Sequence, residues 1–249
     1  MTENPPVVLI TGASQGIGKA SAEAFLRAGY RVALAARSAD KLDAIARDWP
    51  TTALAIPCDV TDPESVAALF DTIVAQFGRL DVVFNNAGAA HPTTEIGDIS
   101  FDDWRRVLSV NLDGSFLIAR GAFRVMRAQS PRGGRIINNG SVSAQVPRIG
   151  GAAYSASKAA ITGLTKVIAL DGRAHDIASS QIDIGNAASD MTDVIAAGIP
   201  QADGSLRAEP VMDVTHVTDA LLYMAGLPLA ANVQFMTVMA TKMPFIGRG

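Results

Sequence analysis

Seven short runs of apolar residues recur along the chain, separated by longer stretches with the apolar spacing of amphipathic helices. The runs are apolar nearly throughout instead of alternating with polar residues, which is typical of strands covered on both faces of a sheet. They predict strands at Val7–Thr11, Arg31–Arg37, Thr52–Val60, Leu80–Gly88, Gly134–Ser141, Ser179–Gly185 and Asn232–Ala240. The stretches between them predict helices at Gly16–Ala28, Asp40–Asp48, Pro63–Phe77, Phe101–Ala128, Ala153–Gly172 and Asp213–Ala225.

This alternation of strand and helix predicts an α/β fold with right-handed crossovers and helices on both faces of the sheet. We expect a single Rossmann-type, doubly wound domain over residues 1–249, with a seven-stranded, mostly parallel sheet. The segment 186–209 is rich in Ala, Gly, Ser and Asp. We interpret it as a flap over a site, because no linker or repeat accompanies it.

Composition and charge exclude several classes of protein. Hydrophobic residues make up 49% of the chain and charged residues 18%, which is enough for a large core. The net charge of −3 gives no electrostatic case for a nucleic-acid partner. No uninterrupted apolar window reaches the length of a membrane span, and the start of the chain is typical of a first strand rather than a signal peptide. The single cysteine, Cys58, fits a reducing, cytoplasmic location, and the histidines lack the spacing of a metal site.

The segment TGASQGIG, Thr11–Gly18, follows the first strand directly and opens the first helix. In that context Gly12 permits a tight turn, Gly16 lets a phosphate approach the backbone, and Gly18 lets the helix pack close to the sheet. Amide groups at the helix start then face an anion. A glycine-rich turn without a ligand is the alternative. The residues predicted to contact a dinucleotide here are Gly12, Ser14, Gln15, Gly16, Ile17 and Gly18.

The end of the second strand predicts which dinucleotide binds. Enzymes that use NAD commonly place an acidic residue there to hold the ribose hydroxyls. This chain instead has Arg37 and Ser38, and a guanidinium suits a 2′-phosphate. We therefore favour NADP(H) over NAD(H), with Arg37 pointing into solvent as the alternative.

Tyr154 and Lys158 are four residues apart in a predicted helix and therefore share one face. A phenol titrates near pH 10, and we expect the ammonium of Lys158 to lower that pKa. Ser141 stands at the carboxyl end of a predicted strand, where ligands bind in open α/β sheets, and its hydroxyl can share in proton transfer. Taken alone, a Tyr four residues before a Lys is typical of an ordinary surface pair.

Together, TGASQGIG, NNAG (Asn85–Gly88), Asn111, Ser141 and YSASK (Tyr154–Lys158) resemble the short-chain dehydrogenase/reductase family in order and approximate spacing. The resemblance extends from Val7 to about Met224, and the ketoacyl-reductase-like and carbonyl-reductase-like members are the nearest in general character. It implies a homo-oligomer, either tetramer or dimer, that acts on a small carbonyl or alcohol substrate.

The resemblance also implies a role for each matching position. Tyr154 would be the general acid in reduction and the base in oxidation, Lys158 would bind the nicotinamide ribose, and Ser141 would orient the carbonyl. Asn111 would interrupt its helix and hold a water that links Lys158 to solvent, although a helix cap is the alternative. Asp59 either meets the adenine or simply begins the next turn, and Asn86 could equally be a turn residue. The further cofactor contacts implied are Asp59, Val60, Asn86, Ala87, Gly88, Gly185 and Ser189.

The chain departs from the family pattern after the sixth predicted strand. Ile184 replaces the usual proline before Gly185, and Ser189 stands where a threonine commonly holds the nicotinamide amide. Asp183 is polar where a small residue is frequent.

We expect an NADP(H)-dependent oxidoreductase. The alternatives are an NAD-linked dehydrogenase of the same fold and a non-catalytic dinucleotide-binding sensor or scaffold.

Overall fold

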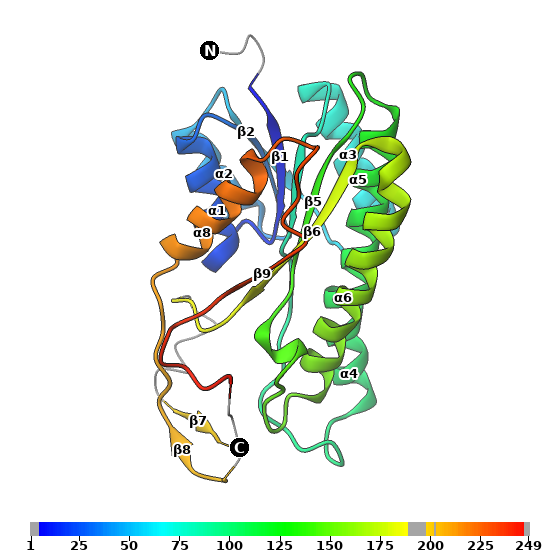
Figure 1. Cartoon of the computed structure of the whole chain (residues 1–249). Coiled ribbons are helices and arrows are strands. Elements are labelled where there is room, and N and C mark those ends of the chain that lie inside the picture. The colour runs from blue at the N-terminus through cyan, green and yellow to red at the C-terminus, as the bar shows by residue number, and fades with distance from the viewer. Residues whose placement is uncertain (1–4, 189–197, 202, 247–249) are drawn as a thin grey trace.

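The computed structural model describes residues 5–188, 198–201 and 203–246, and within these ranges seven strands form one sheet in which all neighbours are parallel. The predicted doubly wound sheet is confirmed. Figure 1 shows the strands in the order β3 (Ala53–Pro57), β2 (Arg31–Ala36), β1 (Val7–Thr11), β4 (Val82–Asn85), β5 (Gly134–Asn139), β6 (Ile177–Ile184) and β9 (Phe235–Val238). The strand order reverses between β1 and β4, which is where open α/β sheets form a ligand crevice.

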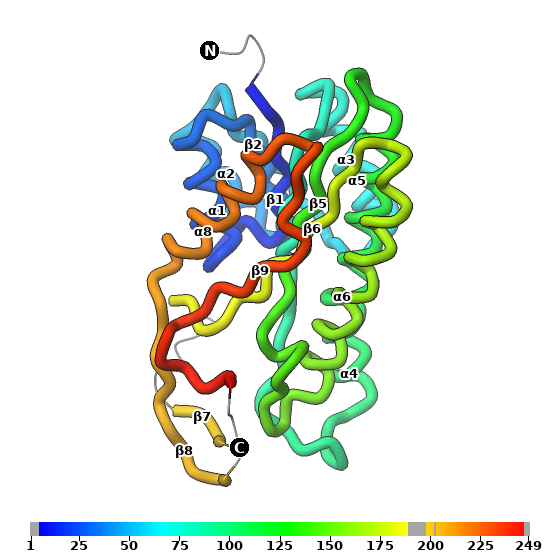
Figure 2. The backbone as a smooth tube through the Cα atoms, in the orientation of Figure 1, coloured from blue at the N-terminus to red at the C-terminus, as the bar shows by residue number. Residues whose placement is uncertain are grey.

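Helices cover both faces of this sheet (Figures 1 and 2). One layer contains α1 (Gly16–Arg27), α2 (Ala39–Asp48) and α8 (Thr215–Gly226), which pack with Val8 and Ile10 of β1 in one apolar cluster. The other layer contains α3 (Pro63–Phe77), α5 (Ser115–Ala128) and α6 (Ala152–Gly172), which pack against the opposite side chains of β1. The strands are therefore buried on both faces, which explains their continuous apolar runs.

The helix predicted at Phe101–Ala128 is interrupted. It consists of α4 (Phe101–Leu108), a π-helical turn at Ser109–Gly114, and α5. Ser100 is the N-cap of α4, because its hydroxyl accepts a hydrogen bond from the backbone N–H of Asp103 at 3.0 Å. The π-helical turn buries Asn111, and such turns frequently mark functional sites.

The predicted flap, 186–209, contains a short antiparallel pair, β7 (Ile199–Pro200) and β8 (Leu206–Arg207), that the sequence did not indicate. Strands of two residues are too short to leave an alternating pattern. Residues 189–197 and 202, and with them the predicted contact Ser189, lie outside the described residues.

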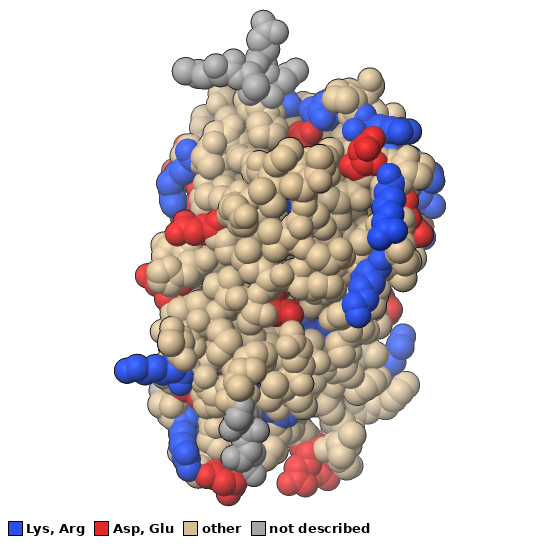
Figure 3. All heavy atoms as spheres, viewed as in Figure 1, with Lys and Arg blue, Asp and Glu red and all other residues tan. Residues whose placement is uncertain are grey.

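The chain after β9 folds back over its own loops. Met243 is buried against Val142, and its sulfur accepts a hydrogen bond from the backbone N–H of Asn186 at 3.4 Å. Figure 3 shows the face that carries α8 and β9, where charged side chains lie mainly at the edges. Across the described residues, the helices are all too short or too polar to cross a bilayer.

Candidate active site

A cavity of about 1000 Å³ opens at the carboxyl edge of the sheet, where the strand order reverses between β1 and β4. Its wall brings together seventeen of the residues predicted from the sequence, whereas Asn111 lies behind the wall. The predicted residues that line it are Gly12, Ser14, Gln15, Gly16, Ile17, Gly18, Arg37, Ser38, Asp59, Val60, Asn86, Ala87, Gly88, Ser141, Tyr154, Lys158 and Gly185.

The glycine-rich loop fits a pyrophosphate. Gly12 has a φ of 66° and Gly16 a φ of 53°, a region that favours glycine. A Cβ on Gly18 would lie only 2.1 Å from the carbonyl oxygen of Gly12, so the helix packs here as closely as the motif predicts. At the start of α1, Gln15 makes no side-chain capping bond and the first turn has no acidic residue. The helix start is therefore suited to an external anion.

Arg37 and Asp59 stand at the ends of β2 and β3, where the sequence placed the adenosine part of a cofactor. Asp59 accepts two hydrogen bonds from Thr61, at 2.9 Å from its N–H and 2.8 Å from its hydroxyl. These bonds, followed by the charge of Arg37, lower the pKa of Asp59. Asp59 thus begins a turn and also lines the cavity, and its contact with the adenine stays a prediction.

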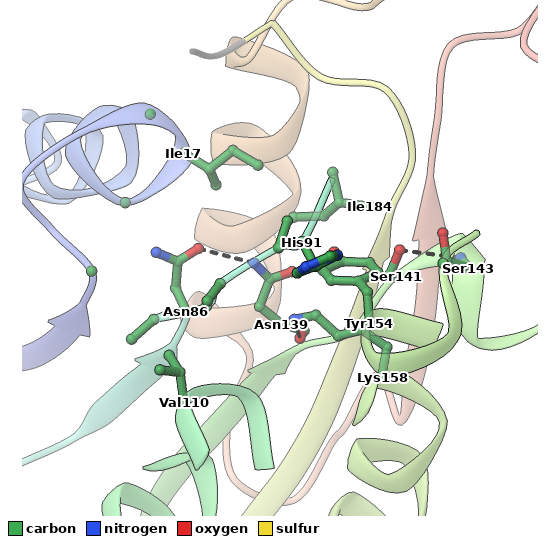
Figure 4. Close-up of a pocket in the computed structure, with 18 of the residues that line it drawn as sticks. Ile17, Asn86, His91, Val110, Asn139, Ser141, Ser143, Tyr154, Lys158 and Ile184 are labelled. Carbon is green, nitrogen blue, oxygen red and sulfur yellow. Dashed lines mark hydrogen bonds between the residues drawn. The ribbon is translucent and has the colours of Figure 1, made fainter. Parts of the chain in front are cut away.

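Asn86 joins the ends of three strands. Its side-chain amide donates to the carbonyl of Thr11 on β1 at 2.8 Å, and its side-chain oxygen accepts from Asn139 on β5 at 2.9 Å (Figure 4). Its backbone N–H donates to the Thr11 hydroxyl at 2.9 Å. Asn86 is therefore a structural tie between β1, β4 and β5 at the cavity wall.

Tyr154 and Lys158 project from the first turns of α6 into the same part of the cavity as Ser141 (Figure 4). The Nζ atom of Lys158 lies 5.7 Å from the centre of the Tyr154 ring and donates to the carbonyl of Asn139 at 2.7 Å. The i, i+4 spacing thus brings the two groups together as the sequence indicates.

The electrostatics of this pair differ from the sequence-based expectation. Burial lowers the pKa of Lys158 to about 8, and the charge of Asp183 opposes that change. Burial also raises the pKa of Tyr154, against a hydrogen bond with Ser141 and the charge of Arg148, which lower it. The expected net lowering of the Tyr154 pKa by Lys158 is therefore wrong for this structure. The ammonium is bonded to Asn139, and burial of the phenol outweighs the groups that favour its ionised form.

Ser141 is buried directly after β5, at the start of a short 3-10 turn, Val142–Ala144. Its hydroxyl oxygen accepts a hydrogen bond from the backbone N–H of Ser143 at 3.1 Å (Figure 4). Its own backbone N–H donates to Asp183 at 3.0 Å. The hydroxyl is thereby held at the cavity wall, near the phenol of Tyr154.

Asn111 supports the cavity from behind. Its side chain accepts from the N–H of Ala89 at 2.7 Å and donates to the carbonyl of Ala89 and the hydroxyl of Ser157, both at 3.0 Å. Ser157 in turn donates to the carbonyl of Tyr154 at 2.7 Å. Asn111 thus links the loop after β4 to the first turn of α6, and its part in a water relay stays a prediction.

An ion pair that no sequence pattern indicated connects the flap to the site. Arg148 donates to Glu209 at 2.6 Å and to Asn186 at 2.8 Å, and Asn186 donates to Glu209 at 2.9 Å. The Glu209 side chain is only 1% exposed. A single acidic residue in a polar stretch carries no sequence signal for such burial, because its partner lies 61 positions away.

Comparisons with known proteins agree with this arrangement. A family model described as short chain dehydrogenase matches residues 6–199. The chain is 34% identical to a 3-oxoacyl-[acyl-carrier-protein] reductase of Synechocystis sp., over 93% of each protein. It is 36% identical to a cis-4-hydroxycyclohexanecarboxylate dehydrogenase of Sinomonas cyclohexanicum, over 93% of this chain and 97% of that protein.

A solved structure supports the fold. The crystal structure of a 3-ketoacyl-(acyl-carrier-protein) reductase from Brucella melitensis, complexed with NADH, superposes with a TM-score of 0.84. The alignment covers 94% of this chain and 97% of that one at 22% identity. With the family match over most of the chain and the cavity residues in their predicted places, the protein belongs to the short-chain dehydrogenase/reductase family of oxidoreductases.

Proposed function

We propose that this protein is an NADP(H)-dependent oxidoreductase that interconverts a ketone or aldehyde and the corresponding alcohol. The observation that carries the proposal is one continuous cavity wall that holds the glycine-rich loop, Arg37 and the Ser141, Tyr154 and Lys158 side chains. A dinucleotide bound along that wall would have its phosphates at α1 and its reactive end beside Tyr154.

Bound NADP(H) would supply the hydride in reduction and accept it in oxidation. Ser141 would hold the substrate oxygen by a hydrogen bond. Tyr154 would donate a proton to that oxygen in reduction and take it back in oxidation. Lys158 would bind the nicotinamide ribose through its ammonium.

The preference for NADP(H) rests on Arg37 and Ser38, which line the cavity directly after β2. β2 ends in alanines, and Arg37 and Ser38 follow without a carboxylate that could accept from ribose hydroxyls. A planar guanidinium matches the geometry of a 2′-phosphate.

The test compares the two cofactors. NADPH and NADH are supplied with a panel of ketones and aldehydes, and oxidation of the cofactor is followed by absorbance. We expect the KM for NADPH to be lower than the KM for NADH. Arg37→Ala should weaken the affinity for NADPH at least tenfold and leave the affinity for NADH unchanged. Arg27→Ala, on the exposed face of α1, is the charge-matched control. Unchanged NADPH affinity in Arg37→Ala would defeat the assignment and favour the NAD-linked alternative.

A non-catalytic sensor or scaffold is the second candidate, and the replacement of proline by Ile184 before Gly185 is the observation that favours it. It predicts cofactor binding without turnover of any substrate in the panel.

The proposal also includes a cytoplasmic homo-oligomer, in which exposed apolar side chains such as Phe116, Leu170 and Phe235 would become buried. Light scattering of the purified protein measures that assembly.

A further inference from the structure

Asp183 is a buried carboxylate beside the catalytic loop that the proposed mechanism does not use. It lies near the carboxyl end of β6, two residues before Gly185, and is 2% exposed. One of its oxygens accepts from the backbone N–H of Ser141 at 3.0 Å and from the Gln181 side chain at 2.7 Å. The other accepts from the Gln145 side chain at 3.2 Å. Asp183 thus connects β6 to the loop that presents the Ser141 hydroxyl.

Gly140, just before Ser141, leaves space for the carboxylate of Asp183 because it has no side chain. A Cβ on Gly140 would lie 2.0 Å from Oδ1 of Asp183 and 2.7 Å from the amide nitrogen of Gln181. Any larger residue at position 140 would therefore displace the carboxylate from the backbone of Ser141. Glycine at 140 and aspartate at 183 are complementary features of this chain.

The charge of Asp183 acts on Lys158. Burial lowers the pKa of Lys158, and Asp183 is the group that raises it again. Reciprocally, burial raises the pKa of Asp183, whereas its hydrogen bonds and the charge of Lys158 favour the ionised form. Its hydrogen-bond partners from β6 and the Ser141 loop, namely Gln181, Gln145 and the Ser141 backbone, are neutral. The charged group on α6 that acts on Asp183 is Lys158, and the charge of Arg148 acts on the phenol of Tyr154.

We propose that Asp183 is a positioning residue of the catalytic centre, which fixes the backbone of Ser141 by its hydrogen bonds and supplies a buried negative charge that acts on Lys158. The part of this inference that concerns catalysis rests on the proposed function. Only a centre that transfers a proton needs Ser141 and Lys158 to be held in this way. The physical core of the inference is the set of hydrogen bonds that Asp183 accepts from the Ser141 loop. The charge of Asp183 is measurable through Lys158 in the protein without cofactor or substrate.

The first test is an NMR titration of the lysine side chains in the cofactor-free protein, with the Lys158 signal assigned from its loss in Lys158→Met. In the wild type the Lys158 midpoint should fall at about 8. Asp183→Asn keeps the shape and an acceptor for the Ser141 N–H, and the exposed Gln145 amide can turn to suit it. Removal of the negative charge should lower the Lys158 midpoint by about one pH unit.

Two further variants make this test robust. Asp183→Ser also removes the charge and should give a downward change in the Lys158 midpoint even if the asparagine variant folds poorly. Asp176→Asn changes the same charge just before β6, where Asp176 is exposed and has a φ of 56° that asparagine tolerates. It should leave the midpoint unchanged. A Lys158 midpoint that stays at its wild-type value in Asp183→Asn and Asp183→Ser would overturn the proposal.

The second test uses turnover with NADPH and a carbonyl substrate from the panel above. Asp183→Ala should lower kcat at least tenfold with little change in the KM for NADPH. Asp183→Asn should recover part of kcat, because it restores the bond to Ser141, but its alkaline limb should move to lower pH. Equal kcat and identical pH profiles in the wild type and both variants would contradict the positioning role. Absence of turnover in the wild type would instead defeat the proposed function and leave the titration as the measure of the inference.

Discussion

The ammonium of Lys158 lies 5.7 Å from the centre of the Tyr154 ring and is anchored by the backbone carbonyl of Asn139. Burial of an ammonium that donates to a neutral carbonyl is costly to folding, and the lowered pKa of Lys158 reports that cost. If Tyr154 and Lys158 act as proposed, this cost is one that the proposed function imposes on stability.

The pH dependence of stability follows from the Lys158 pKa. In the unfolded chain Lys158 titrates near its ordinary value of 10.5, and in the folded protein at about 8. Between these values the unfolded state binds more protons, so stability rises as the pH increases. The difference corresponds to about 3 kcal/mol at most.

Lys158→Met removes this titration. At pH 7 we expect the variant to be more stable than the wild type by about 1–2 kcal/mol, after allowance for the lost bond to Asn139. The advantage should shrink by pH 10, because the wild-type ammonium has then lost its charge. Urea denaturation of both proteins at the two pH values measures it. A difference that is the same at pH 7 and pH 10 would contradict the assigned pKa.

Gly18→Ala tests the glycine-rich loop. The added Cβ would meet the Gly12 carbonyl at 2.1 Å, and a backbone atom cannot move aside without opening the loop. We expect NADP(H) affinity to fall at least tenfold, as measured by calorimetry. Gly163→Ala in α6 is the matched control, because a Cβ there meets nothing within 4 Å and should stabilise the helix by about 0.5–1 kcal/mol. Equal affinities in the two variants would argue against a phosphate site at this loop.

Arg148→Met tests the ion pair between Arg148, in the loop before α6, and Glu209 in the flap. The change leaves the negative charge of Glu209 buried, and the free energy of unfolding should fall by about 3 kcal/mol. Arg207→Met breaks a second Arg–carboxylate pair, between Arg207 and Asp203. The two side chains are 64% and 53% exposed, respectively. That control should change stability by less than about 1 kcal/mol. A small effect of Arg148→Met in the same denaturation experiment would show that the buried pair does not hold the flap.

Much of the fold could be predicted because its signals are local. A strand such as Val7–Thr11 is a continuous apolar run, and the boundaries of Pro63–Phe77 follow from a proline at the helix start and a glycine after its end. The position of Tyr154 beside Lys158 follows from helix periodicity alone. Apolar spacing alone predicts one continuous helix at Phe101–Ala128, whereas the family resemblance correctly places an interruption at Asn111. The π-helical form of that interruption could not be predicted, because it depends on the bonds of Asn111 to Ala89 across the site.

The electrostatics of the site could not be predicted, since they depend on burial and on distant partners. Asp183 was recognisable as an unusual polar residue, but its bond to the Ser141 backbone spans 42 positions. The sign of the Tyr154 pKa change was wrong because sequence spacing shows the nearby ammonium and not the extent of burial. An ion pair between residues of two different loops leaves no periodic pattern in the sequence.

Tyr154, as the group that moves the proton, is the centre of the proposed mechanism. Tyr154→Phe deletes only the phenolic oxygen, so the ring still packs beside Lys158 and NADPH should bind within about threefold of wild-type affinity. Tyr223→Phe removes the same oxygen from an exposed side chain on α8 and is the matched control. The decisive measurement is kcat for carbonyl reduction with NADPH in the three proteins. The account predicts a loss of at least about a hundredfold in Tyr154→Phe alone, and a wild-type kcat in that variant would contradict it.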